Sequence, residues 1–185
     1  MAKAGEAARD LLAEYDTEYG IDEVPPVPVT AIAKDLLLLD VVDIDDIRTL
    51  ASAPTDGGPI SGMLTTVDKT IWVDRREADR SPARRRFTIA HELGHWMLHA
   101  KRGEKGNYQR FCRGPDLDSH AETGKQEREA NDFAAELLMP EEVIAAVAPE
   151  CGFNLALLAT RFEVSVPALE LRLMKLKLLP VWMRS

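Results

Sequence analysis

Apolar residues recur at helical spacing near the start of the chain. Between residues 6 and 19 one helical face would carry five apolar or aromatic side chains: Ala8, Leu11, Leu12, Tyr15 and Tyr19. A proline-rich stretch at residues 25–28 ends this helix, and a short second helix is predicted around residues 32–37. The aliphatic run at residues 38–44 then predicts an edge strand.

Two further segments, residues 60–67 and 70–74, have the character of strands and flank a turn at Asp68-Lys69. They predict a β-hairpin, and with it a small antiparallel sheet. Gly62 lies in the first of these strands. It would permit a peptide substrate to approach closely by β-augmentation along the edge of the hairpin, or it relieves a bend.

The second half of the chain predicts helices. Ser81 followed by Pro82 is typical of a helix start, and this helix is expected to run to about Arg102. Residues 103–122 lack periodicity and predict a loop beside an active site. The remaining predicted helices are residues 124–138, a helix that begins at Pro140, and residues 155–162 and 166–178, with Asn154 and Ser165 as N-caps.

Composition and charge exclude several classes of protein. The chain has 185 residues, 45% of them apolar and 29% charged, which is typical of a soluble globular protein. Its net charge of −8 argues against broad binding to nucleic acid or to anionic membranes. No export signal or membrane-spanning run is visible, so we expect a cytoplasmic protein in which Cys112 and Cys151 are free thiols.

The strongest chemical signal is the HExxH pattern from His91 to His95. Residues four apart share a helical face, so the two imidazoles can converge on one metal ion. Glu92 lies about 100° further round the helix, close enough to address a metal-bound water as general base. A chance match on a surface helix is the alternative. The apolar residues around the motif instead predict a buried helix, whose polar side chains need a partner such as a metal.

Catalytic zinc usually has three protein ligands, so a third is needed. His99 is eight residues beyond His91, about 12 Å along the helix axis, and is assigned a structural role or a role beside the ligands. Glu127 and Asn131 are four apart and can act together, with the carboxylate on the metal and the amide on a ligand histidine. Glu129, on a different face, is the competing candidate.

Residues 86–95 and 127–140 together resemble the ImmA/IrrE family of metallopeptidases, and residues 60–63 and 71–73 resemble that family's hairpin. The resemblance implies a gluzincin-like site for Zn²⁺, with Mn²⁺ as the alternative metal. It also implies that Glu127 is a metal ligand and Glu92 the catalytic base. The implied substrate is a helix-turn-helix repressor of a mobile element, a stress response or a toxin–antitoxin pair.

Three groups of residues allow two interpretations each. His120, Tyr108 and Arg113 are candidates, by residue type alone, for stabilising an oxyanion, and a solvated role is the alternative. The arginines at residues 84–86 oppose the dipole of their helix, and pairing with acids is favoured over a function. The last two predicted helices have helix-turn-helix spacing, but their apolar stripe favours packing or partner contact over DNA binding. This stripe consists of Val166, Leu169, Leu173 and Leu176.

We therefore expect an α+β fold with a small twisted antiparallel sheet, zincin-like metal-bearing helices and a helical C-terminal part. Residues 1–150 are assigned to a zincin-like metalloprotease domain and residues 151–185 to a helix-turn-helix-like extension packed on it. The predicted activity is zinc-dependent hydrolysis of a peptide bond in a regulatory protein. The alternatives are a metal-binding interaction module, a toxin-like partner of a repressor without proteolytic turnover, or a DNA-binding regulator.

Overall fold

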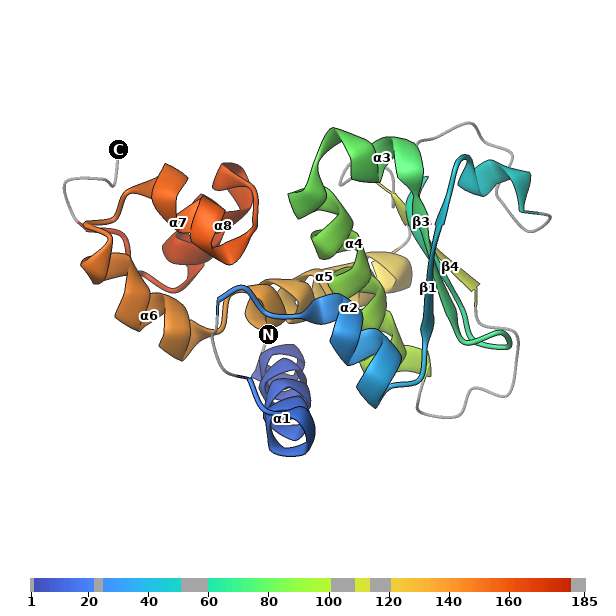
Figure 1. Cartoon of the computed structure of the whole chain (residues 1–185), viewed down its shortest axis with the longest axis horizontal. Helices are drawn as coiled ribbons and strands as arrows, with labels where there is room; N and C mark the ends of the chain where they lie inside the picture. The colour runs from blue at the N-terminus through green and yellow to red at the C-terminus, as the bar shows by residue number, and fades with distance from the viewer. Residues whose placement is uncertain (1, 22–24, 51–59, 101–108, 114–120, 181–185) are drawn as a thin grey trace.

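The structure is a computed structural model that describes residues 2–21, 25–50, 60–100, 109–113 and 121–180. A sheet lies at one end of the molecule and the C-terminal helices lie at the other, with helices α4 and α5 between them (Figure 1). In chain order the main elements are α1 (Ala2–Tyr19), α2 (Val29–Ala31), β1 (Asp40–Ile44), β2 (Ile60–Thr65), β3 (Thr70–Asp74), α3 (Arg75–Arg80), α4 (Pro82–His95), β4 (Gln109–Arg113), α5 (Ala121–Leu138), α6 (Glu141–Glu150), α7 (Leu155–Phe162) and α8 (Val166–Lys175).

The sheet has the strand order β1-β3-β2-β4. Strand β2 pairs antiparallel with β3, which confirms the predicted hairpin. Strand β1 pairs parallel with β3, with Asp40 opposite Thr70. The α+β class is confirmed, but the sheet is mixed and not wholly antiparallel. The reason is that β1 and its neighbour β3 are not joined by a tight turn, because residues 45–59 and the whole of β2 intervene.

Strand β4 corrects the prediction of a loop over residues 103–122, since residues 109–113 pair with β2 and α5 begins at Ala121. The sequence of β4 has no alternation of polar and apolar residues, so its pairing with β2 and not a local pattern makes it a strand. Because β2 is now paired on both sides, Gly62 does not lie on an open strand edge. Tyr108 and His120, and the side chain of Arg113, lie outside the part of the chain that the structure describes.

Helix α4 begins as predicted, with Pro82 as its first residue and the Arg84 amide donating to Ser81 Oγ at 3.4 Å. After His95 the helix continues as a π-helical segment, Trp96–Ala100. Every residue from Thr88 to His95 is buried, because α4 packs against the sheet on one side and against α5 on the other. The predicted end of this helix near Arg102 lies outside the described residues.

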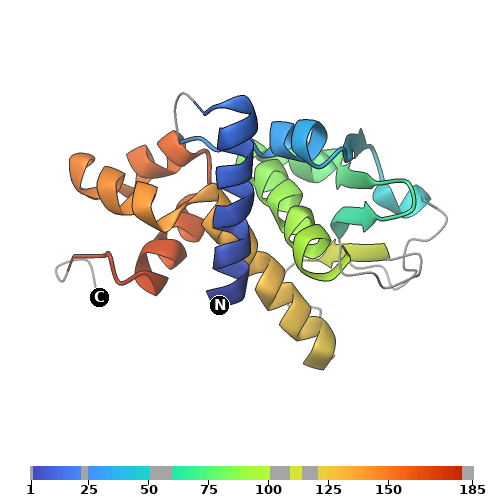
Figure 2. The same cartoon turned by 90° about the horizontal axis from the view of Figure 1, so that it is seen from below.

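One continuous apolar core joins the helices on both sides of α5. Helix α1, which confirms the predicted opening helix, packs on α5 (Figure 2). The core includes Leu11 from α1, Leu93 from α4, Phe133 from α5 and Phe162 from α7, all of them fully buried. The proposed division of the chain at residue 150 stays a prediction.

Helices α7 and α8 form the predicted C-terminal pair. The Leu157 amide donates to Asn154 Oδ1 at 3.1 Å, and the Ala168 amide donates to Ser165 Oγ at 3.3 Å, so both predicted N-caps are present. In the apolar stripe of α8, Leu169 and Leu173 are buried in the common core, while Val166 is exposed. This burial agrees with a packing role for the stripe.

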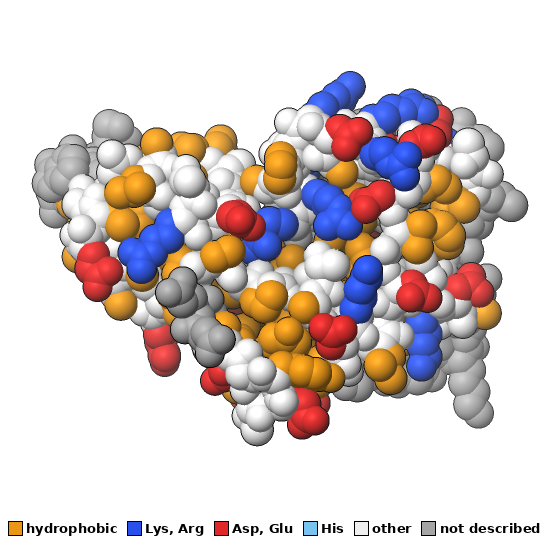
Figure 3. Space-filling model, in the orientation of Figure 1, with side chains coloured by type: hydrophobic (Ala, Val, Ile, Leu, Met, Phe, Trp, Pro, Cys, Tyr) orange, Lys and Arg blue, Asp and Glu red, His pale blue; other side chains and the backbone are white. Residues whose placement is uncertain are grey.

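The arginines of α3 and α4 lie against acidic residues of β1 and the segment that follows it. Arg75 pairs with Asp45 at 2.6 Å, and Arg85 pairs with Asp43 at 2.8 Å. Arg86 pairs with Glu163 at 3.2 Å. Figure 3 shows basic and acidic side chains interleaved over the end of the molecule that carries the sheet and α3. Pairing with acids, the interpretation favoured for residues 84–86, therefore holds for Arg85 and Arg86.

Two further features concern the cysteines and the length of the helices. Cys151 carries a free thiol, whereas the side chain of Cys112 is outside the described part of the chain. Among the helices that the structure describes, none has the length and apolar character needed to cross a membrane.

Candidate metal centre

Helices α4 and α5 meet so that three side chains converge. His91, His95 and Glu127 each offer one ligand atom, and these atoms all lie within 4.8 Å of one another. The Nε2 atoms of the two histidines are 3.0 Å apart. Glu127 Oε2 lies 3.1 Å from His91 Nε2, and Glu127 Oε1 lies 3.1 Å from His95 Nε2. The structure thus brings together the three residues that the sequence predicted as metal ligands.

The orientation of His91 is set from α5. Its Nδ1 donates to Asn131 Oδ1 at 2.9 Å, since an amide oxygen can only accept a hydrogen bond. With the proton on Nδ1, the lone pair of His91 Nε2 faces His95 and Glu127. Asn131 therefore holds the imidazole in the tautomer and direction that a metal ligand needs, which is the role predicted for it.

The donor set fits a divalent cation. Two imidazole nitrogens and a carboxylate oxygen are typical ligands of zinc, at metal–ligand distances of about 2.0–2.1 Å. A tetrahedral arrangement at that radius separates neighbouring ligand atoms by about 3.3 Å. The observed separations of 3.0 and 3.1 Å are close to this value. Two imidazoles and a carboxylate that converge in this way are stabilised when a cation lies among them.

The cluster is buried. His91 and His95 are almost fully inaccessible, and the side chain of Glu127 is 12% exposed. Burial raises the pKa of Glu127, but His91 and His95 in their protonated form lower it by more, through hydrogen bonds and positive charge together, so the net pKa lies well below the usual range of a glutamate. Glu127 is therefore an ionised carboxylate that brings negative charge to the cluster.

Glu92 is fully buried on α4, where strand β2 passes close to it. A Cβ atom placed on Gly62 would lie 3.3 Å from Glu92 Oε1 and only 2.3 Å from Thr88 Cγ2. Real side chains do not approach that closely, so glycine at this position is what allows β2 to pack on the motif helix. Close packing of the sheet against α4 thus accounts for Gly62 without a strand edge. The pairing of β2 with β4 also shifts register between Ile60 and Gly62, which agrees with the bend predicted as the alternative.

Gly94 has the same function on the opposite side of α4. A Cβ atom there would lie 3.0 Å from Ala130 Cα and 3.1 Å from the Ala130 carbonyl oxygen on α5. The missing side chain lets α4 and α5 approach closely enough for Glu127 to reach both histidines. No role was predicted for Gly94, although a glycine inside a buried helix is a signal of close packing.

His99 and Glu129 lie beside the cluster and are not part of it. His99 Nε2 is 3.8 Å from Glu129 Oε2, and the ring centroids of His95 and His99 are 5.6 Å apart. Glu129 is also 3.9 Å from Lys125 Nζ, one turn earlier on α5. These positions fit the structural role predicted for His99 and leave Glu127 as the carboxylate that faces both histidines.

The fold and this cluster point to the metallopeptidase class, in which two histidines on one helix and an acid on another hold a metal ion. The chain matches the family described as IrrE N-terminal-like domain, a peptidase family, over residues 49–174. That match spans more than half of the chain, so the protein belongs to this family, and the resemblance to ImmA/IrrE proteins is confirmed.

Comparison with solved structures gives a similar fold. The chain resembles a Mycobacterium tuberculosis transcriptional regulator with a TM-score of 0.59 and 18% sequence identity. The likeness covers 91% of this chain and 45% of that chain, so this protein spans less than half the length of the regulator. At this identity the likeness concerns the fold alone. A comparison with the curated proteins found no match.

Proposed function

We propose that this protein is a zinc-dependent endopeptidase whose metal ligands are His91, His95 and Glu127 and whose general base is Glu92. The observation that carries the proposal is the convergence of three side chains: the two histidine Nε2 atoms are 3.0 Å apart, and each lies 3.1 Å from one of the two carboxylate oxygens of Glu127. Its support is the buried HExxH helix, the amide that orients His91 and membership of a peptidase family. Mn²⁺ is the alternative metal.

A divalent ion held by these residues polarises a peptide carbonyl and lowers the pKa of a water molecule to near neutrality. The protein supplies the remaining functions. Asn131 fixes the ring of His91, and Glu127 contributes negative charge. Glu92, buried on the same helix, takes up a proton as water attacks the peptide carbonyl and returns a proton to the leaving amine.

The proposed substrate is a helix-turn-helix repressor, as the family resemblance implies. The similar fold of a protein described as a transcriptional regulator agrees with a role in gene regulation. We place the reaction in the cytoplasm, with residues 1–150 carrying the catalytic centre and residues 151–185 forming an extension packed on it.

The decisive variant is Glu92→Gln, which keeps the size of the side chain but cannot accept a proton. We expect metal content and melting temperature like those of the wild type, and cleavage of a repressor slowed by about 10² or more. The substrate to use is the repressor encoded beside the gene, with fragments mapped by mass spectrometry. Glu129→Gln, an acid beside the cluster that faces His99, is the matched control and should cleave normally.

Two outcomes would contradict the proposal. Cleavage by Glu92→Gln at the wild-type rate would remove Glu92 from the mechanism. A wild type that holds one equivalent of metal but cleaves no repressor would favour the metal-binding interaction module. Elemental analysis of the same samples distinguishes zinc from manganese, and His99→Ala should retain the metal that His91→Ala loses.

A further inference from the structure

A groove lies between α1 and the start of α6, and no residue of α4 or of the sheet lines it. Its volume is about 390 Å³. Nine residues form its walls and floor: Arg9, Leu12, Ala13, Asp16, Ile21, Pro140, Glu141, Glu142 and Val143. The groove is therefore separate from the metal centre, and the proposed peptidase chemistry leaves it without a function.

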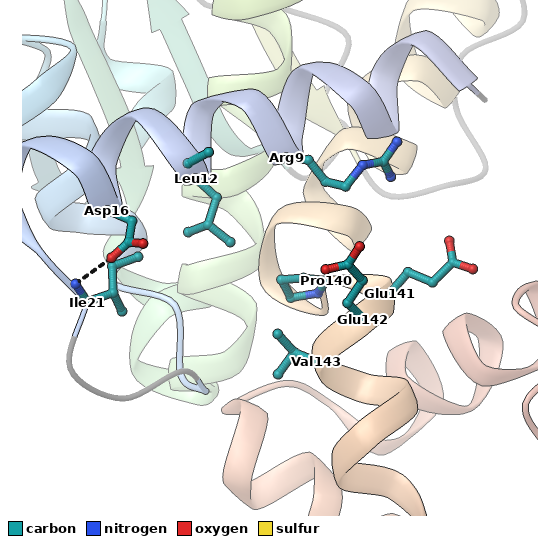
Figure 4. Close-up of a pocket in the computed structure, with 9 residues that line it drawn as sticks. Arg9, Leu12, Asp16, Ile21, Pro140, Glu141, Glu142 and Val143 are labelled. Carbon is teal, nitrogen blue, oxygen red and sulfur yellow. Dashed lines mark hydrogen bonds between the residues drawn. The ribbon is translucent and has the colours of Figure 1, made fainter.

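The floor of the groove is apolar. Figure 4 shows Leu12 reaching down from α1 on one side, with Pro140 and Val143 from the start of α6 on the other. Leu12, Ile21 and Val143 are only partly buried, and each packs against the main core of the protein. Apolar surface continuous with the core thus faces the groove, where a partner can cover it.

The rim of the groove is acidic. Asp16, Glu141 and Glu142 are exposed, and none of them has an ion-pair partner among the residues that the structure describes. Asp16 Oδ1 accepts a hydrogen bond from the Ile21 amide at 2.9 Å, which fixes its position. Arg9 is the single cation among the nine lining residues, and it is engaged with Glu136 at 3.2 Å. The rim therefore presents three carboxylates that no cation in the described part of the chain neutralises.

The dipole of α6 accounts for acids in its first turn, but it does not account for an apolar floor between those acids and α1. The walls of the groove are the side chains of α1 and of the start of α6, together with Ile21. Helices have no open backbone edge, so an extended peptide cannot add to them as a strand. The surface fits a helix laid between two helices.

We propose that this groove binds a cationic amphipathic helix of a protein partner. Apolar side chains at helical spacing would cover Leu12, Ile21 and Val143, while lysines or arginines would meet Asp16, Glu141 and Glu142. Charge complementarity selects a cationic segment, because a neutral or acidic helix leaves three carboxylates unpaired or repelled. The inference is independent of metal binding and of Glu92.

The test is fluorescence anisotropy with a labelled helical peptide made of leucine, alanine and lysine, with the leucines on one face. We expect saturable binding that weakens as salt is raised. The double reversal Glu141→Lys/Glu142→Lys should weaken it by about tenfold or more. The matched control, Asp79→Lys/Glu170→Lys, makes the same charge change at exposed sites outside the groove and should bind nearly as the wild type does.

Val143→Asp tests the apolar floor and should also weaken binding, with melting curves to confirm that each variant is folded. The proposal fails if the lysine peptide does not bind, or if a peptide with glutamate in place of lysine binds equally well. It also fails if both double variants bind alike. Displacement of the peptide by an uncharged detergent monomer, with no effect of the charge reversals, would identify the groove as a site for a small apolar ligand instead.

Discussion

Helix α5 buries a glutamate toward each of its ends, and the two differ in what faces them. Glu136 accepts a hydrogen bond from Arg9 at 3.2 Å, and it pairs with Arg172 on its other oxygen. The Glu141 amide also donates to Glu136, at 3.3 Å. Glu127 instead lies 3.1 Å from each of two imidazoles.

The type of partner assigns different roles to the two glutamates: Glu136 belongs to a structural ion pair, and Glu127 is the candidate metal ligand. A guanidinium is always charged, so Glu136 receives its positive charge from the protein and connects α5 to α1 and α8. The partner of Glu127 is a histidine that Asn131 turns to present a lone pair. We therefore propose that a metal ion from outside the chain completes that cluster.

The largest effect is expected when Glu136 is replaced. Glu136→Gln leaves Arg172 buried without its counter-charge and should lower the free energy of unfolding by about 3–5 kcal/mol, measured by urea denaturation. Metal content below the unfolding transition should be unchanged. Arg9→Ala is the control, because Arg9 is half exposed and should cost less than about 1 kcal/mol. If the two variants lower the free energy of unfolding equally, the buried ion pair of Glu136 with Arg172 does not stabilise the fold as expected.

Glu127→Gln should weaken metal binding and leave the stability of the metal-free protein unchanged. The side chain keeps its shape but loses the charge, so metal affinity should fall by more than the about 10–100-fold typical of residues that only orient a ligand. Denaturation in the presence of a chelator should show a stability close to that of the wild type without metal. Glu129→Gln should keep its metal, and the reverse result would make Glu129 the ligand.

Gly62→Ala probes the contact between the sheet and the motif helix. The added methyl group would meet Thr88 Cγ2, and this overpacking should cost about 1–3 kcal/mol. Thr88→Ser removes that methyl group, so the double variant should recover most of the loss in a double-mutant cycle. If the two changes are simply additive, close packing at Thr88 is not the reason for glycine at this position.

Asn131→Ala should weaken metal binding less than Glu127→Gln does. Loss of the hydrogen bond to His91 Nδ1 frees the ring and should lower metal affinity by about 10–100-fold, or about 1.4–2.7 kcal/mol. Competition with a chromophoric chelator measures the metal affinity. Arg128→Ala, an exposed change on the same helix, should leave the affinity unchanged. An affinity for Asn131→Ala equal to that of the wild type would contradict its orienting role.

Patterns among neighbouring residues determined the helix starts, the shared face of the two histidines and the hairpin. Ser81, Asn154 and Ser165 cap helices where their side-chain oxygens predicted it, because capping involves only neighbouring residues. The helical period placed His91 and His95 on one face before any tertiary contact was known. The hairpin of β2 and β3 followed from two strand-like segments and the turn between them.

Only the tertiary structure decided the rest, because it depends on segments that are far apart in the chain. Strand β4 has no pattern of its own and exists through its pairing with β2. Strand β1 can pair parallel with β3 because a long connection that includes β2 joins the two strands. Glu127 and Glu129 are both plausible ligands on α5 when only the sequence is considered. The close contact of Gly94 with Ala130 sets how α4 crosses α5, and that crossing turns Glu127 toward the histidines.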